Sequence, residues 1–393
     1  MGERSFDLVL FGATGFTGRL TAEYLARAAS GARPKPLSWA IAGRNSAKLK
    51  RLAEDLAALG GAKPACLEAA VDDPASLHRL AAATRVLLTT VGPYDLYGDG
   101  VVEAAVREGC HYLDITGEPA FVARTLERWH EPARQQGLKI VSCCGFDSIP
   151  HDLGAWLTVR QLPAGEPIAV DAFVRMEGKF SGGTWQSALN AFGQMRSSLV
   201  GKVEAAAGRK VRGVQQRPHF EIRLAEWVAP MPTIDPWIVL RSAAALPEYG
   251  PEFRYSHNLC VGSFWSLSKL LAGVGSVVAL AQLGPTRRWL QSLQPSGEGP
   301  SPERRARSHF EVLFFGKARG GATAHVVVAG GDPGYTETSK MLAESALCLV
   351  GDEAGLPRTA GVLTPAVAFG DLLVERLRRA GLKLDVVDRR PPQ

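Results

Sequence analysis

The sequence contains few cysteines and no cysteine pattern that indicates a redox pair or a metal site. Its 393 residues include six cysteines, none of which forms a Cys-x-x-Cys pair or lies at metal-ligand spacing from a histidine, so we expect no bound metal. Scattered cysteines in a chain of this length are typical of reduced proteins. Because a strand is expected from residue 6 onwards, there is no room before it for a signal peptide. We therefore expect a cytoplasmic protein.

The sequence also lacks a concentration of charge of either sign. The net charge of +6 is spread along the chain, and the basic stretch around Arg209, Lys210, Arg212 and Arg217 has no interleaved aromatic residues. Such a stretch is typical of a solvated loop, so we expect no nucleic-acid partner. A hydrophobic content of 46% and a charged content of 21% are ordinary for a globular enzyme.

The first 150 residues alternate short hydrophobic runs with helical stretches, which is the pattern of a doubly wound sheet. We expect Ser46 to cap the helix that follows the second strand. The expected strands are 6–11, 37–42, 66–71, 86–90, 111–114 and 138–142. One expected helix follows the first strand and ends at Ala29, and two others span 46–59 and 74–83. The sequence thus predicts an α/β fold in which residues 1–150 form a Rossmann-type domain with a parallel sheet.

The rhythm changes after residue 151, where we expect a second α+β domain. Its expected elements are a strand at 168–176, a helix from near Thr184, an antiparallel pair at 309–316 and 322–329 with a Gly320-Gly321 turn, helices at 336–350 and 364–379, and a strand at 382–387. Ser181–Thr184 would hold an anionic or carbonyl group of the substrate, or simply cap the helix. Residues 151–355 are expected to bind substrate and to form a homo-oligomer, and the tail, 356–393, to pack back on the first domain.

One segment, 259–283, is unusually poor in charge. Lys269 is its only charged residue, and its length approaches that of a membrane span, but its glycines and serines weaken its apolarity. A buried or subunit-interface helix is our first expectation. A helix on a membrane surface or against a lipid substrate is the second, and it would place the protein peripherally at the plasma membrane. A true span is the third.

A glycine-rich turn follows the first strand. Gly12 allows a tight turn, Gly15 lets the backbone approach a pyrophosphate, and Gly18 lets the helix pack on the sheet. The helix N-terminus then offers N–H groups to phosphates. The turn sits between a clear strand and a clear helix, which favours dinucleotide binding. The full cofactor-binding turn is Gly12-Ala13-Thr14-Gly15-Phe16-Thr17-Gly18.

The end of the second strand indicates which dinucleotide is bound. An NAD enzyme usually has an acidic residue there, which binds the ribose hydroxyls. This strand instead ends in Ile41-Ala42-Gly43-Arg44-Asn45, with no acid. The Arg44 guanidinium suits a bidentate contact with a 2′-phosphate, although it would otherwise merely sit at the start of a surface helix. We therefore expect NADP as the cofactor.

Three loops at the carboxyl ends of the strands carry unusual polar residues, and ligands of an open α/β sheet bind at this edge. In the first loop, Gly92 and Pro93 would pass close to the nicotinamide, and Tyr94 would donate a proton or a hydrogen bond. A structural turn is the alternative. In the second, Asp114 or Glu118 would bind the nicotinamide ribose or the substrate, unless the carboxylate caps the next helix.

The third loop, Cys143–Asp152, lies at the expected domain junction, where substrate pockets tend to form. His151 has an ordinary pKa that suits proton delivery. Asp147 and Ser148 would bind substrate or, alternatively, cap the following helix. We therefore take Tyr94, Ser148 and His151 as the catalytic candidates.

Short-chain reductases share a glycine turn of this kind but place a Tyr and a Lys four residues apart, and none of the seven tyrosines here has a lysine at that spacing. The chain instead resembles the saccharopine dehydrogenase-like oxidoreductases, most closely their bacterial trans-acting enoyl reductase branch. The resemblance covers nearly the whole chain and is weakest between about 200 and 300. It rests on Phe11–Gly18, Ala42–Arg44, Val91–Tyr94, Asp114–Glu118, Gly145–Pro150 and Gly361–Ala366.

This resemblance implies an NADP-linked oxidoreductase. In the enoyl reductase branch the substrate is an unsaturated acyl chain, either a small molecule or bound to a carrier. The implied partner is a polyketide synthase that makes cell-envelope lipids, including glycolipids. The first alternative is an oxidoreductase acting on a C–N bond, as saccharopine dehydrogenases do, which would need clustered arginines. The second is a membrane-associated scaffold that binds NADP without turnover. The arginines available for a cluster are Arg160, Arg175, Arg196 and Arg223.

Overall fold

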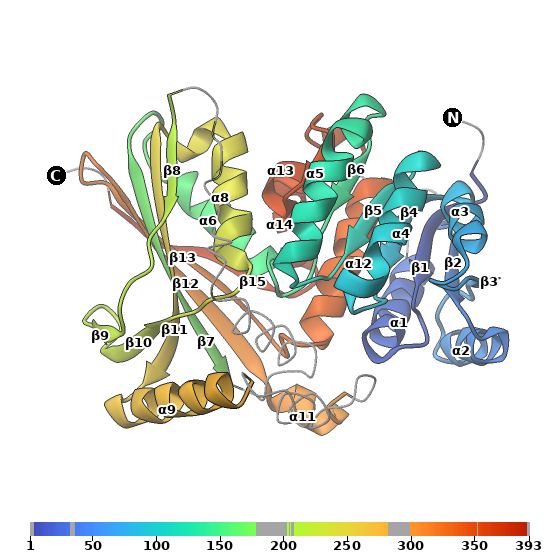
Figure 1. Cartoon of the computed structure of the whole chain (residues 1–393), viewed down its shortest axis with the longest axis horizontal. Helices are drawn as coiled ribbons and strands as arrows, with labels where there is room; N and C mark the ends of the chain where they lie inside the picture. Colours follow the sequence, from blue (N-terminus) through green and yellow to red (C-terminus); the bar gives the residue numbers. More distant parts are fainter. Residues whose placement is uncertain are drawn as a thin grey trace. The chain divides into compact units, whose positions relative to one another are not determined.

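A computed structural model describes residues 4–31, 36–177, 203, 205, 208–281, 299–351 and 353–390 of the chain. The helix expected near Thr184, the Ser181–Thr184 segment and Arg196 lie outside these residues. The chain divides into two compact units, Met1–Ile149 with Tyr335–Ala380, and Pro150–Gly334 with Gly381–Gln393. Figure 1 labels the elements of both units.

The first unit contains a seven-stranded sheet whose strands all run parallel. Its order is β14-β6-β5-β4-β1-β2-β3, which is the Rossmann order 3-2-1-4-5-6 extended by one strand, and the predicted fold class is confirmed. Leu8, Val9 and Leu10 of β1 are fully buried, as expected of a strand covered on both faces. The strands are β1 (Phe6–Phe11), β2 (Trp39–Gly43), β3 (Ala65–Glu68), β4 (Thr84–Thr89), β5 (His111–Asp114), β6 (Lys139–Val141) and β14 (Gly361–Leu363).

The helices of this unit differ in detail from the sequence expectations. Asn45, not Ser46, caps α2, because the Asn45 side chain accepts a hydrogen bond from the Lys48 amide. The helix expected at 364–379 is two helices, since Gly370 takes a φ of +55° between them. The helices are α1 (Phe16–Ser30), α2 (Ser46–Ala58), α3 (Pro74–Ala82), α4 (Tyr94–Arg107), α5 (Pro119–Gln135), α12 (Thr336–Gly351), α13 (Pro365–Phe369) and α14 (Asp371–Arg379), with a 3₁₀ turn at Glu353–Gly355.

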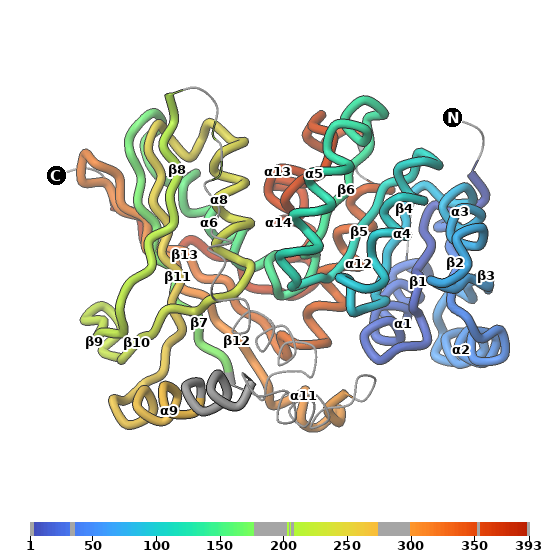
Figure 2. Tube along the Cα trace, viewed as in Figure 1, coloured from blue at the N-terminus to red at the C-terminus, as the bar shows by residue number. Residues whose placement is uncertain are grey.

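Helix α12, which the sequence grouped with the second domain, packs in the first unit against α1. The Ser339 hydroxyl donates to the Thr17 carbonyl at 3.2 Å, and the rings of Phe16 and Tyr335 meet edge to face with centroids 4.8 Å apart. In Figures 1 and 2 this late part of the chain, drawn in orange and red, runs among the blue and green elements of the first unit. Residues far apart in sequence therefore surround the glycine turn.

The second unit is built on an eight-stranded mixed sheet. Its order is β15-β13-β12-β7-β11-β10-β9, and β8 pairs with β11. The expected antiparallel pair is confirmed as β12 and β13, with Phe310 opposite Gly330. The last strand, β15, pairs with β13, so this part of the tail belongs to the second sheet. The strands are β7 (Ile168–Glu177), β8 (Lys210–Gly213), β9 (His219–Glu221), β10 (Glu226–Pro230), β11 (Glu252–Gly262), β12 (His309–Ala318), β13 (Thr323–Gly330) and β15 (Lys383–Arg390).

Helix α6 packs tightly on this sheet. A Cβ placed on Gly154 of α6 would lie 2.2 Å from a ring carbon of Phe314 in β12, so the glycine allows the close approach. Among the described residues, no helix is both long and apolar enough to cross a membrane. The helices are α6 (Ile149–Val159), α8 (Asp235–Ala245), α9 (Phe264–Ala281) and α11 (Pro302–Arg307), with a 3₁₀ turn at Pro247–Tyr249.

Candidate cofactor site and catalytic loops

The glycine turn connects β1 to α1, and two of its glycines are required by space. Gly12 has a φ of +89°, and a Cβ there would lie 2.7 Å from the Val91 side chain. A Cβ on Gly18 would lie only 2.1 Å from the Gly12 carbonyl oxygen. The Thr90 hydroxyl donates to that same oxygen at 3.2 Å. The turn is thus fixed against the end of β4, at the point where the strand order reverses.

The N-terminus of α1 has a positive end suited to a phosphate. Gly15 is its N-cap, no side chain caps it among the described residues, and its first turn has no acidic residue. A Cβ on Gly15 would come within 3.3 Å of the Gly12 carbonyl, so glycine keeps the backbone open here. Exposed amides and the helix dipole favour an anion at this position.

Arg44 lies at the end of β2, where the sequence predicts the choice between the two dinucleotides. It is exposed at the end of β2, between buried Gly43 and the N-cap Asn45, and it forms no ion pair with a described residue. A cation with no ion pair among the described residues, next to a glycine turn of this kind, would suit a 2′-phosphate. The chemistry of these residues therefore fits NADP.

The carboxylate of Glu118 lies at the N-terminus of α4. It accepts hydrogen bonds from the backbone amides of Tyr94 and Asp95 at 3.0 and 2.8 Å. Burial raises the pKa of Glu118 above its ordinary value, while these two bonds lower it. The Glu118 side chain thus caps α4, the helix before it in the sequence. By position Glu118 is also the N-cap residue of α5, but its side chain makes no capping hydrogen bond there.

Tyr94 has its hydroxyl inside the protein. The side chain is buried, and its hydroxyl donates to the Thr89 carbonyl at 3.0 Å and accepts from the Ile115 amide at 3.4 Å. Burial raises the Tyr94 pKa well above its ordinary value. The observed contacts therefore commit the phenolic proton to the backbone at the end of β4.

Asp114 ties the end of β5 to the loop after β6. It is fully buried and accepts hydrogen bonds from the amides of Thr116 and Cys143 and from the Ser142 hydroxyl, all between 2.9 and 3.1 Å. Burial, opposed by these bonds, raises the Asp114 pKa to about 6. With its acceptor atoms occupied, Asp114 acts as a structural anchor of the two loops.

Ser148 differs from Tyr94 in having an uncommitted hydroxyl. It is fully buried, and its hydroxyl has no hydrogen-bond partner among the described residues. Its amide donates to the Cys143 carbonyl at 2.9 Å. The same loop is held from α12, because the Thr338 hydroxyl accepts from the Phe146 amide at 3.0 Å.

His151 lies in α6 and belongs to the second unit. It is fully buried, and burial lowers its pKa to about 3. The expectation that its pKa suits proton delivery is therefore wrong for this environment, because the ring is neutral near pH 7. Its neighbours are Asp235 and His257, whose carboxylate and ring lie against it. No local sequence signal joins these residues, since they are far apart in the chain.

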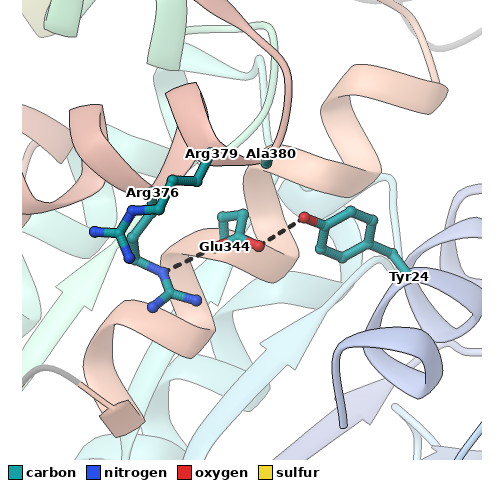
Figure 3. A pocket seen from close by; sticks show the side chains of 5 residues that line it. All are labelled: Tyr24, Glu344, Arg376, Arg379 and Ala380. Atoms are coloured by element: carbon teal, nitrogen blue, oxygen red, sulfur yellow. Dashed lines mark hydrogen bonds and ion pairs between the residues drawn. The ribbon is translucent and has the colours of Figure 1, made fainter. Parts of the chain in front are cut away.

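A shallow pocket on the first unit lies away from the glycine turn (Figure 3). Glu344 of α12 is at its centre: it accepts from the Tyr24 hydroxyl at 2.6 Å and from the Arg376 guanidinium at 2.8 Å. Burial and the carboxylate raise the Tyr24 pKa. Tyr24 lies eight residues beyond the start of α1, or ~12 Å along the helix, so the pocket is far from the glycine turn. Its hydrogen bond and ion pair join α1 and α14 to α12, so this pocket serves the packing of the three helices.

Comparisons with known proteins decide the family. Residues 8–141 match the family described as "Saccharopine dehydrogenase NADP binding domain". A putative trans-acting enoyl reductase of Mycobacterium tuberculosis is 36% identical over 97% of both chains. A trans-acting enoyl reductase of Mycobacterium bovis is 34% identical over the same shares. The chain belongs to the saccharopine dehydrogenase-like oxidoreductases.

The solved saccharopine dehydrogenase (L-Glu forming) of Saccharomyces cerevisiae has the same fold as this oxidoreductase. The TM-score is 0.57 at 13% identity, covering 98% of this chain and 100% of that one. The matched NADP-binding domain begins inside β1 and ends at the last residue of β6, so it contains both the glycine turn and Arg44. The protein is an NADP-dependent oxidoreductase, as predicted.

Proposed function

We propose that this oxidoreductase reduces the carbon–carbon double bond of an α,β-unsaturated acyl thioester. The acyl chain is lipid-like or polyketide, free or carrier-bound, and belongs to lipid or glycolipid biosynthesis, with a polyketide synthase as the partner. One observation carries this proposal: the mycobacterial relatives named trans-acting enoyl reductases align with 97% of this chain and 97% of their own. The loops around the glycine turn are therefore inside the shared region.

The chemistry places clear demands on the protein. NADPH held by the glycine turn and Arg44 would supply a hydride to the β-carbon of the enoyl thioester. The electron pair of the double bond moves toward the thioester oxygen, and the α-carbon then takes a proton from a protein group or from water. Fixed hydrogen-bond donors stabilise such an oxygen.

Of the three catalytic candidates, Ser148 is the one we propose as a donor to the thioester oxygen. Its hydroxyl is uncommitted among the described residues, whereas the Tyr94 hydroxyl already donates to the Thr89 carbonyl. His151 is neutral near pH 7 because burial lowers its pKa to about 3. Water is then the proton source that we propose for the α-carbon.

The charge pattern of the second unit gives less support to chemistry on a C–N bond of an amino-dicarboxylate. Such a substrate would need arginines with spare charge. Arg175 pairs with Glu226 and Glu311, each at 2.9 Å, and Arg223 pairs with Glu221 at 2.8 Å. These two guanidinium groups are therefore already neutralised by the protein itself.

Measuring NADPH oxidation with two substrate panels tests the proposal. We expect turnover with enoyl thioesters of increasing chain length, on coenzyme A or on an acyl carrier protein, and none with saccharopine-type imines. Turnover with the imines alone would replace the proposal by the C–N alternative. Tight NADPH binding with no oxidation by either panel would favour the scaffold alternative.

We also propose that the start of α9 contacts a lipid surface, which would place the protein peripherally at a membrane. Phe264, Trp265 and Leu271 are 54%, 75% and 51% exposed, and a helix with exposed aromatic residues suits a membrane interface. We expect the wild type to co-sediment with anionic liposomes and Phe264→Ser/Trp265→Ser to lose this binding. If the double variant instead changes only the oligomeric state, the segment is a subunit interface.

A further inference from the structure

Three buried polar side chains meet inside the second unit, although the spacing of cysteines and histidines predicts no metal. The Nε2 atom of His257 lies 3.6 Å from Oδ2 of Asp235, and Nε2 of His151 lies 3.8 Å from the same oxygen. One ligand atom from each residue lies within 4.8 Å of the other two. The three side chains are between 0% and 2% exposed.

These side chains come from three separate elements of the unit. His151 lies in the first turn of α6, Asp235 in the first turn of α8, and His257 in the middle of β11. The rings of His151 and His257 are nearly perpendicular, with centroids 4.8 Å apart, so they are not stacked on each other. The cluster therefore joins two helices to the central part of the sheet.

The distances suit metal coordination better than direct hydrogen bonding. At 3.6 and 3.8 Å, the nitrogen–oxygen separations exceed hydrogen-bond length. Two ligands of a tetrahedral zinc ion, each at about 2.0–2.1 Å from the metal, are about 3.4 Å apart. A small inward movement of the side chains would bring all three atoms to bonding distance from one ion.

The orientation of His257 supplies an independent observation. Its Nδ1 atom lies 3.2 Å from the Tyr255 hydroxyl, so that contact fixes the ring. Its Nε2 atom is buried and has no hydrogen-bond partner among the described residues. The Thr233 hydroxyl donates to Oδ2 of Asp235 at 2.5 Å. Histidine ligands of metals are commonly held by a partner on the other ring nitrogen, as the Tyr255 hydroxyl holds Nδ1 of His257.

We propose that His151, Asp235 and His257 bind one divalent transition-metal cation, with Zn²⁺ as the best match. Two imidazoles and a carboxylate are ligands that zinc accepts. Water takes the fourth position. The ion connects α6, α8 and β11, so its role is to stabilise the second unit.

Metal analysis of the full-length protein tests this site. We expect one Zn²⁺ per chain after equilibration with Zn²⁺ and gel filtration, and a lower melting temperature after treatment with a chelator. His257→Gln and Asp235→Asn should each lose the ion. His219→Gln is the matched control, because His219 lies in β9 of the same unit, where it pairs with Glu221, and it should keep the full amount.

Two results would overturn the proposal. One is a wild-type protein that retains no Zn²⁺ and gives no visible absorption of tetrahedral Co²⁺ when Co²⁺ replaces it. The other is equal metal content in the wild type and in folded His257→Gln. If both cluster variants fail to fold, the visible spectrum of Co²⁺ added to the wild type still tests the site. Co²⁺ in a tetrahedral site of nitrogen and oxygen ligands absorbs visible light differently from solvated Co²⁺.

Discussion

Gly12 and Gly18 approach each other so closely that a Cβ on Gly18 would lie 2.1 Å from the Gly12 carbonyl oxygen. The turn before α1 and the first residues of α1 therefore form one packed unit. The same oxygen accepts a hydrogen bond from the Thr90 hydroxyl. The glycine turn, the start of the helix and the end of β4 are thus linked through a single backbone group.

Gly18→Ala should weaken NADPH binding. The added methyl group must displace the turn, and overpacking of this kind costs about 1–3 kcal/mol. If the displaced turn loses this much free energy in binding, the NADPH Kd should rise about 5- to 150-fold. Fluorescence titration measures the Kd. Gly273→Ala is the control, because a Cβ at Gly273 meets nothing within 4 Å. An unchanged Kd in folded Gly18→Ala would contradict the packing argument.

Arg44→Ala should reduce the preference for NADPH over NADH. A charge-assisted hydrogen bond is worth about 1.5–3 kcal/mol, so we expect the ratio of the two Kd values to change about 10- to 100-fold, while NADH binding stays nearly constant. Arg51→Ala, on the exposed face of α2, controls for loss of a nearby cation. Equal losses for both cofactors would show that Arg44 does not contact the 2′-phosphate.

Asp114 should make stability depend on pH in the acidic range. Burial raises its pKa to about 6 in the folded protein, compared with about 3.9 in an unfolded chain. Its stabilising contribution is therefore complete below about pH 4, falls as pH rises to about 6, and is constant above that. Asp114→Asn keeps the shape of the side chain and removes this dependence.

Urea unfolding between pH 4 and pH 7 measures the effect. The free energy of unfolding of the wild type, relative to that of Asp114→Asn, should decrease with rising pH. Glu54→Gln, which changes an exposed carboxylate of α2, should follow the wild-type curve. Parallel curves for the wild type and Asp114→Asn would show that folding does not raise the pKa of Asp114.

Ser148→Ala and Tyr94→Phe should separate catalysis from structure. If Ser148 donates to the thioester oxygen, its loss should lower kcat about 100-fold, the size expected for one oxyanion donor, with little change in melting temperature. Tyr94→Phe removes the bond to the Thr89 carbonyl and should destabilise the protein by ~1 kcal/mol with kcat retained. Steady-state kinetics and thermal melts distinguish the two, and the opposite pattern would make Tyr94 the catalytic group.

The elements that the sequence predicts well are those with local signals. The parallel strands of the first unit are continuous hydrophobic runs, and the glycine turn lies directly between a strand and a helix. Errors arose where neighbouring residues compete for one role: Asn45 rather than Ser46 caps α2. Similarly, the interruption of the tail helix depends on the conformation of Gly370, whose φ of +55° is not visible in a hydrophobic pattern.

The catalytic candidates show a further limit of sequence reasoning. Tyr94, Ser148 and His151 are polar residues at the expected edge of a sheet or next to it, but their hydrogen bonds and burial depend on distant segments. Burial lowers the His151 pKa to about 3, and a carboxylate 24 residues further along the chain, that of Glu118, caps the helix that begins at Tyr94. The shift of a side chain's pKa and the number of hydrogen bonds that its hydroxyl makes depend on the packing of the whole protein.

The sequence by itself determined that the cofactor is NADP, because the signals that predict it, the glycine turn and Arg44, are local ones next to β1 and β2. It also determined the parallel sheet of the first unit and the antiparallel pair of β12 and β13, because strand and helix periods are local. Only the tertiary structure decided that α12 packs on α1, that β15 joins the second sheet, and that His151, Asp235 and His257 meet. These contacts join residues tens to hundreds of positions apart, and burial of apolar surface, which depends on the whole chain, brings them together.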